Sequence, residues 1–300
     1  MVTRLLALAV ALSVASPARA EEEGLAPNGP WTLDYDTDSC ALRRLFGTGD
    51  DRAILEFRRF GPGLNLQTIV GSSRLKARNT GQFRYRFDEA EDWQVAVNTI
   101  AMKLNNGDSA VLFSSSFAEV PLPAGIDEAP EVEIYTSSNE LKAAEREQAA
   151  AIDSITLLGA FGRDLTLRFG KLDKPMQALQ GCVDELMSHW DIDVEAHKTL
   201  TRPARPINLA EVPRMMDYPP RMIRESMPGL VNVRLAIDET GGITSCHIQM
   251  PLSDPAFAES SCADIQHALD FDPALDKDGK PIASYWITRV VFTLNQTPFP

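Results

Sequence analysis

The sequence predicts an α+β protein: a mostly-β N-terminal domain with a packed helix, followed by a small antiparallel sheet with two helices. Two kinds of apolar spacing lead to this prediction. Alternating apolar residues, typical of half-buried strands, dominate residues 31–190, and three- and four-residue spacing marks a helix near the end of that range. The length of 300 residues is enough for about two domains, each with its own core.

The first 20 residues are expected to be a cleavable export signal. Residues 1–4 are a short basic head, residues 5–15 are an apolar run, and residues 18–20 read small-x-small. The apolar run is shorter than the roughly 20 residues that span a membrane, so an uncleaved anchor is the weaker alternative. We expect an exported chain without a membrane span, in which residues 21–30 are a short leader.

The chain is acidic. It has 42 Asp and Glu against 29 Lys and Arg, a formal net charge of −13. The expected signal contains Arg4 and Arg19 and no acidic residue, so its removal leaves a net charge of −15. An acidic protein is a poor partner for nucleic acid or for an anionic membrane surface. The acidic residues are spread along the chain, which is typical of a solvated surface.

Four cysteines, Cys40, Cys182, Cys246 and Cys262, follow the expected signal. An even number of cysteines in an oxidising compartment favours two disulfides. Four cysteines allow three pairings, and closure within each proposed domain selects Cys40–Cys182 and Cys246–Cys262. A metal site is the alternative, but the sequence has no Cys-x-x-Cys and no His at ligand spacing. We therefore expect neither a metal nor a cofactor.

The first domain, residues 31–190, is expected to consist mainly of short strands. The pattern predicts strands at residues 53–60, 64–70, 82–88, 93–100, 110–115, 155–158 and 165–169. The first two are expected to form a hairpin across the Gly-Pro-Gly turn at residues 61–63. Phe83, Tyr85 and Phe87 face one way in their strand, and this stripe is either core or a binding surface.

Two helices are expected in the first domain. One begins at Ser138 with capping residues and continues through residues 142–151. The other begins at residues 173–175 with a proline at the first helical position. Its apolar face consists of Met176, Leu179, Val183, Leu186 and Trp190. Residues 191–216 are expected to be a short proline-containing linker that keeps the two domains close together. Its proline-rich, basic stretch at residues 201–206 is expected to be extended and exposed.

Residues 217–297 are expected to form the second domain. Its expected elements are a short helix from Pro219 to Glu225, strands at residues 230–238 and 243–250, a helix from Asp254, and a last strand at residues 284–294. The glycines of the turn at residues 238–242 can adopt positive φ, which suits a hairpin. Two helices are expected to pack on one face of the three strands.

This second domain resembles the TonB C-terminal domain family over residues 217–295. The resemblance rests on Tyr-Pro-Pro at residues 218–220, Gly-Leu-Val-Asn-Val at 229–233, Asp-Glu-Thr-Gly at 238–241 and Phe-Asp-Pro-Ala-Leu-Asp-Lys-Asp-Gly-Lys-Pro at 271–281. It implies a small antiparallel sheet with two helices. It also implies protein–protein contact in the periplasm, where a sheet edge pairs with a short segment of an outer-membrane transporter.

Energy transducers of that family have an N-terminal spanning helix and a long proline-rich spacer. In this chain an expected signal and a β-rich domain stand in their place. The resemblance therefore implies the binding module without the mechanical coupling.

We expect a periplasmic, non-catalytic adaptor that pairs a sheet edge with an extended segment of a partner. The expected partner is a protein of the cell envelope, such as an outer-membrane protein. The last strand is the expected docking edge, with Tyr285, Trp286 and Arg289 as partner-binding candidates. The alternatives are that this strand is ordinary core, or that the sheet makes a homodimer.

The competing hypothesis is an envelope hydrolase with its site in the first domain. Cys246 and His247 are strand neighbours that point to opposite faces, so they cannot form a dyad. The serines at residues 114–116 lack the Gly-x-Ser-x-Gly elbow of a hydrolase. The acidic run at residues 34–38 resembles a calcium loop but lacks the glycine and bidentate glutamate that should follow. The residues thus favour binding over catalysis.

Overall fold

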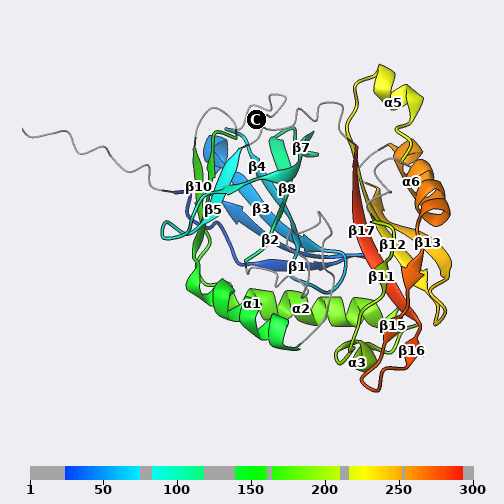
Figure 1. The fold of residues 1–300 in the computed structure, drawn as a ribbon. Helices are drawn as coiled ribbons and strands as arrows, with labels where there is room; N and C mark the ends of the chain where they lie inside the picture. The colour runs from blue at the N-terminus through cyan, green and yellow to red at the C-terminus, as the bar shows by residue number, and fades with distance from the viewer. Residues whose placement is uncertain are drawn as a thin grey trace, which may run out of the picture.

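A computed structural model describes residues 24–74, 83–117, 139–160, 164–209, 216–251 and 254–292. The expected signal peptide, Ser138 and residues 293–297 lie outside the described residues. Antiparallel sheets and packed helices make up the described part, which confirms the α+β class (Figure 1).

The N-terminal part is built on a six-stranded antiparallel sheet with the order β1-β2-β3-β4-β8-β7. Its strands are β1 Thr32–Tyr35, β2 Cys40–Phe46, β3 Ala53–Arg59, β4 Leu66–Ser72, β7 Val97–Lys103 and β8 Ser109–Ser115. A short 3-10 helix, η1 Gly49–Asp51, lies between β2 and β3. The predicted hairpin of residues 53–60 and 64–70 is confirmed, because β3 pairs with β4 across residues 60–65.

A second sheet with the order β10-β9-β5-β6 packs over one face of the first (Figure 1). Its strands are β5 Arg84–Phe87, β6 Gln94–Val95, β9 Ser154–Leu158 and β10 Leu165–Arg168. The stripe of Phe83, Tyr85 and Phe87 is buried between the two sheets and is therefore core. The strand predicted at residues 93–100 is instead two strands, because the chain crosses at Ala96 from the edge of one sheet to the edge of the other.

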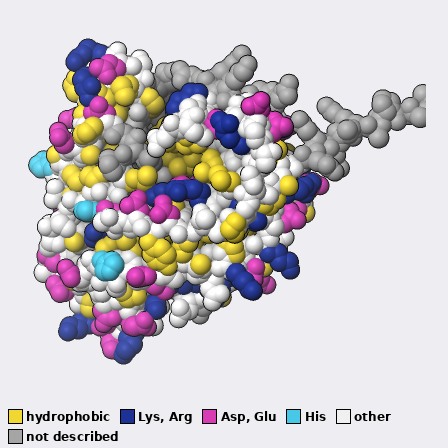
Figure 2. Space-filling view, turned by 180° about the vertical axis from the view of Figure 1, so that it is seen from behind, with side chains coloured by type: hydrophobic (Ala, Val, Ile, Leu, Met, Phe, Trp, Pro, Cys, Tyr) yellow, Lys and Arg dark blue, Asp and Glu magenta, His cyan; other side chains and the backbone are white. Residues whose placement is uncertain are grey.

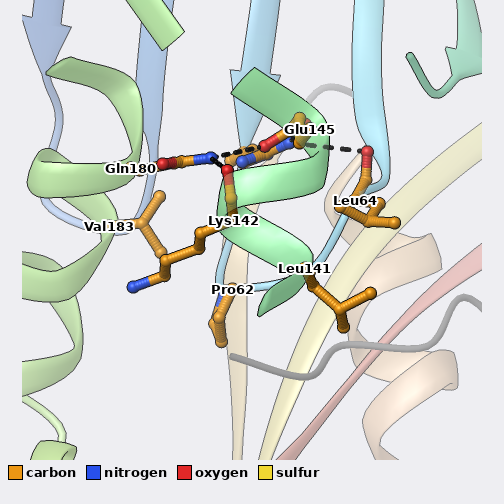
Figure 3. A pocket seen from close by; sticks show the side chains of 9 residues that line it. Pro62, Leu64, Leu141, Lys142, Glu145, Gln180 and Val183 are labelled. Atoms are coloured by element: carbon orange, nitrogen blue, oxygen red, sulfur yellow. Dashed lines mark hydrogen bonds and ion pairs between the residues drawn. The ribbon is translucent and has the colours of Figure 1, made fainter. Parts of the chain in front are cut away.

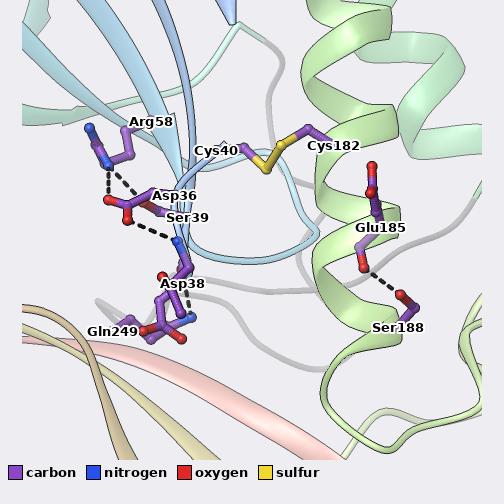
Figure 4. The surroundings of a disulfide bond; sticks show 10 residues. Asp36, Asp38, Ser39, Cys40, Arg58, Cys182, Glu185, Ser188 and Gln249 are labelled. Carbon is purple, nitrogen blue, oxygen red and sulfur yellow. Dashed lines mark hydrogen bonds and ion pairs between the residues drawn. A yellow bond between two sulfur atoms is a disulfide. The ribbon is translucent and has the colours of Figure 1, made fainter. Parts of the chain in front are cut away.

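Two predicted helices close this core: α1 Asn139–Ala151 and α2 Asp173–Ser188. The apolar face of α2 is buried against the sheets, as its spacing predicts. The disulfide between Cys40 and Cys182 joins β2 to α2 and confirms the predicted pairing (Figure 4). Both cysteines are 1% exposed, so this disulfide is part of the core.

The C-terminal part is a three-stranded antiparallel sheet with the order β13-β12-β17 and with α6 on one face. Its elements are α5 Pro220–Arg224, β12 Gly229–Ile237, β13 Ile243–Pro251, α6 Pro255–Ala268 and β17 Ser284–Phe292. The α6 helix begins where predicted, because the Asp254 carboxylate accepts a hydrogen bond from the N–H of Ala256 at 3.0 Å. The disulfide between Cys246 and Cys262 joins β13 to α6 and confirms the second predicted pairing.

The segment between the two large parts is tied to the C-terminal sheet. The small elements involved are α3 Val194–His197, β11 Arg205–Pro206, β14 Phe271–Asp272, β15 Ala274–Leu275 and β16 Pro281–Ile282. Strand β11 pairs with β14, and the N–H of Thr201 donates to the carbonyl of Leu275 at 3.0 Å. Ala204 is buried in the C-terminal core. Residues 201–206 are extended, as predicted, but residues 194–197 form a helix and Ala204 is buried. The prediction of an exposed connection is therefore wrong at Ala204, because this stretch packs on the C-terminal sheet.

The second face of the three-stranded sheet packs on the outer face of the six-stranded sheet. Leu230 of β12 contacts Ile69 and Leu112, and beside them the Asn232 amide donates to Gln67 Oε1 at 3.2 Å. The layers are therefore the four-stranded sheet, the six-stranded sheet, the three-stranded sheet and α6. Among the described residues, no helix is long and apolar enough to cross a membrane.

The surface carries both signs of charge. Figure 2 shows acidic and basic side chains interspersed with apolar ones on the face seen from behind. Surface pairs such as Arg52–Asp108 and Arg205–Asp272, each at 2.8 Å, join opposite charges. The acidic excess is thus distributed, as the sequence predicts.

Candidate protein-binding site

Strand β17 is an edge of the three-stranded sheet. It pairs with β12 along its whole length, from Gly229↔Phe292 to Ile237↔Ser284. In the described part of the chain, no strand pairs with its other side. An edge strand presents backbone N–H and C=O groups that an added extended segment can bind. The strand predicted as the docking edge therefore lies at an edge.

The two halves of β17 differ in burial. Residues 284–287 are buried, whereas residues 288–291 are half-buried. Any segment that adds to this edge therefore finds the backbone most accessible along the second half. Buried side chains in the first half hold the strand in place.

Tyr285 and Trp286 are both packed at 7% exposure. Tyr285 faces the N-terminal part, where its ring meets Trp190 edge-on at 5.0 Å. Burial raises the pKa of its hydroxyl, and the charge of Asp184 adds to the effect. Trp286 faces α6 and packs on Phe271 at 5.4 Å. In this conformation the two rings anchor β17 in two different cores, and their contact with a partner stays a prediction.

Arg289, the third candidate, is half-buried and links β17 to its neighbour β12 and to the six-stranded sheet. Its Nε donates to Asn232 Oδ1 at 3.2 Å, and its Nη1 donates to the hydroxyl of Ser114. Because Asn232 also binds Gln67, the arginine belongs to a polar network between the three-stranded and six-stranded sheets. It lies in the more accessible half of the edge.

A histidine that the sequence analysis did not single out, His197, holds the start of β17. His197 Nδ1 lies 2.7 Å from the carbonyl of Asp193, so this nitrogen carries a proton and donates. Its Nε2 lies 3.0 Å from the hydroxyl of Ser284 and therefore accepts. Burial lowers the pKa of His197, which keeps the ring neutral. The two residues are 87 positions apart, so local spacing carries no signal for this pair.

This Ser–His geometry does not make a catalytic site. His197 and Ser284 are each 4% exposed, so a substrate carbonyl has no approach to the hydroxyl. Cys246 is in a disulfide, and His247 Nε2 instead lies 2.8 Å from Asp38 Oδ1. The pair of His197 and Ser284 is a structural link between α3 and β17.

A pocket lies between the β3–β4 turn and helices α1 and α2 (Figure 3). At its base Arg59 and Glu145 form a buried ion pair, and Gln180 Nε2 donates to Glu145 Oε2 at 2.9 Å. Lys142 at its side pairs with Asp184 at 2.5 Å. The opposite charges are paired with each other, as buried charges need to be, and this pairing indicates a structural role for the network.

The acidic run at residues 34–38 is also occupied by protein groups. Asp34 pairs with Arg43 and Asp36 with Arg58, each at 3.4 Å. No group of three or more His, Cys, Asp or Glu among the described residues is placed to hold a metal ion.

The three-stranded sheet with its α6 layer has the architecture implied by the resemblance. Residues 214–294 match the family model of the Gram-negative bacterial TonB protein C-terminal domain. This match confirms the family suspected for residues 217–295. Domains of this family are envelope-associated modules that interact with outer-membrane proteins and are in general non-catalytic. No curated protein matches the chain.

Proposed function

We propose that this protein is a periplasmic adaptor that binds an extended segment of an envelope protein along the outer edge of β17. The observation that carries the proposal is that β17 is an edge strand of the TonB-like sheet with a half-buried second half, residues 288–291. Main-chain hydrogen bonds supply affinity in this kind of recognition, and alternate side chains supply specificity.

The first domain limits how a partner reaches the sheet. It covers the face that carries Leu230 and Asn232, and α6 covers the other face. The two edge strands, β13 and β17, are what remain for an added strand, and β17 is the one proposed here. In this arrangement Tyr285 and Trp286 position β17, and Arg289 is the candidate that lies closest to the accessible backbone.

Site-specific photo-cross-linking in intact envelopes tests the proposal. A photoreactive residue at Val290, on the edge, should capture a distinct envelope protein. The same residue at Glu259, on the exposed side of α6, should not capture it. Equal capture from both positions, or capture from Glu259 alone, would count against the edge. A product of twice the protein's mass from Val290 would instead favour a homodimer through the same edge.

A hydrolase with its site in the first domain is the competing proposal. The pocket beside Glu145 is the natural place to look, but its polar groups are paired with one another, which favours the binding function. Hydrolysis of p-nitrophenyl acetate by the purified folded protein, and not by the heat-denatured protein, would support the hydrolase.

A further inference from the structure

Three arginines in the described part of the chain stack on tryptophan rings. The pairs are Arg44 over Trp31 at 5.7 Å, Arg86 over Trp93 at 4.5 Å and Arg234 over Trp190 at 4.6 Å. A guanidinium group that lies over an indole ring still directs its N–H groups outward in its own plane, where they bind acceptors. The three pairs can therefore be compared by the hydrogen-bond acceptors that their guanidinium N–H groups have.

Two of the three guanidinium groups find acceptors within the protein. Arg44 Nη1 donates to the carbonyl of Phe169 at 2.5 Å, and Arg86 Nη1 donates to the carbonyl of Glu89 at 2.8 Å. Arg234 makes no hydrogen bond and no ion pair with any described residue. Its Nε is buried without a partner, as is the Nε of Arg86, but Arg234 also lacks the Nη contact that Arg86 makes. A half-buried donor without an acceptor is destabilising, so this arrangement calls for an explanation.

Arg234 lies on the face of β12 that meets the six-stranded sheet. Its neighbours across the sheet are His247 on β13 and Ile287 on β17. Burial lowers the pKa of its guanidinium, and the charge of Asp38 opposes this effect. The Asp38 carboxylate instead lies 2.8 Å from His247 Nε2. Among the ion pairs of the described residues, none joins Asp38 to Arg234.

The junction is open to solvent on the side of His247. The His247 side chain is 45% exposed and the Asp38 side chain 19%. Gln249 of β13 holds the loop of Asp38 in place, because its Nε2 donates to the Asp38 carbonyl at 3.3 Å (Figure 4). Arg234 is itself half-buried, and Nε is the one atom of its guanidinium that is fully buried without a partner, so a small group can reach the Nη atoms from solvent.

We propose that Arg234, held on Trp190, binds a single carboxylate group at the junction of the three-stranded and six-stranded sheets. The guanidinium fork matches the two oxygens of a carboxylate. The charge of Asp38 opposes the binding of any anion here, and it opposes a doubly charged phosphate more than a monoanionic carboxylate, so a carboxylate fits better. The group can come from a polypeptide terminus or from an acidic side chain. The site lies on the central strand β12, on the face towards the six-stranded sheet, and not on the outer edge of β17 where the partner is proposed to bind.

The test monitors the indole N–H of Trp190 by nuclear magnetic resonance in the full-length protein. The protein has four tryptophans, and the signal that Trp190→Phe removes is the one to follow. N-acetylglycine presents a terminal carboxylate, N-acetylaspartic acid amide presents a side-chain carboxylate, and N-acetylglycinamide is the neutral control. Inorganic phosphate is titrated in parallel. At least one carboxylate should shift the Trp190 signal saturably, and the stronger of the two identifies the source.

Arg234→Gln should weaken carboxylate binding by about tenfold or more, because a charge-assisted bidentate contact is lost. Arg86→Gln is the matched control, since it removes another tryptophan-stacked arginine, and it should leave the affinity unchanged. If Arg234→Gln does not fold, Arg234→Lys keeps the charge but loses the fork and should also bind more weakly. The proposal is overturned if no carboxylate gives a saturable shift, if phosphate binds more tightly, or if the folded Arg234 variant binds as well as the original protein.

Discussion

His197 accepts a hydrogen bond from the hydroxyl of Ser284 and thereby joins α3 to the first residue of β17. The neutral form of the ring is the one that fits this site, because burial lowers the pKa of His197 below its ordinary value of 6.5. The unfolded chain therefore binds a proton more readily than the folded protein, and the link makes stability depend on pH.

We expect the free energy of unfolding to fall as the pH drops below 6.5 towards the folded pKa of His197. Each pKa unit by which the folded state lies below the unfolded state changes the free energy of unfolding by about 1.4 kcal/mol. Urea unfolding at pH 7.5 and 5.5 measures the loss, and His197→Gln should make it smaller. His267→Gln changes an exposed histidine and is the control. An identical pH dependence in the His197 variant and the original protein would contradict the assignment.

Gly61 leaves room for β17. A Cβ atom at this position would lie 2.2 Å from Ile287 Cδ1, so Gly61→Ala should destabilise the protein by about 1–3 kcal/mol through overpacking. Ile287→Val removes the Cδ1 atom, and the double variant should be less destabilised than the two single effects added together. Denaturant unfolding of the four proteins measures this coupling. Strict additivity would show that Gly61 acts through its backbone instead.

The buried pair of Arg59 and Glu145 should matter far more than an exposed pair. Glu145→Ala leaves an uncompensated guanidinium that is 3% exposed, and it should cost about 3–5 kcal/mol. Glu89→Ala removes the partner of Arg168 in a pair whose side chains are 54% and 48% exposed, and it should cost about 1 kcal/mol or less. Thermal and urea unfolding compare the two variants. Similar losses would mean that the Arg59 charge is solvated after all.

The two disulfides should differ in their resistance to reduction. Cys40 and Cys182 are each 1% exposed in the first core, whereas Cys246 and Cys262 are half-buried near the surface. A thiolate reductant must reach a sulfur atom, so Cys246–Cys262 should be reduced first in the folded protein. Timed alkylation and mass spectrometry give the order. Earlier labelling of Cys182 would show that the first core opens more easily than the C-terminal sheet.

Much of the fold could be predicted from the sequence because local burial leaves a local pattern. Val231, Val233 and Leu235 alternate because one face of β12 packs on α6, and the cysteine pairings follow from closure within each part. The docking of the two parts could not be predicted. Asn232 and Arg234 occupy the positions that normally face solvent in such a strand, yet they face a second sheet.

The sequence predicts which strand forms the candidate site, but not the contacts that the residues of this strand make. The family motifs identify β17 as the last strand, and its edge position follows from the strand order. The sequence alone predicts that Tyr285 and Trp286 are anchors for a partner. Only the layers on both sides show that Trp190 and Phe271 already cover these rings.

The bond between Gln67 and Asn232 has a consequence for how the protein changes over evolutionary time. Each side chain is buried, and each lies in a different part of the chain. A substitution of Gln67 leaves the Asn232 amide N–H without its acceptor, and a substitution of Asn232 leaves Gln67 Oε1 without its donor, so tolerated changes should occur at both together. Such paired variation would tie the evolution of the β-rich part to that of the TonB-like part.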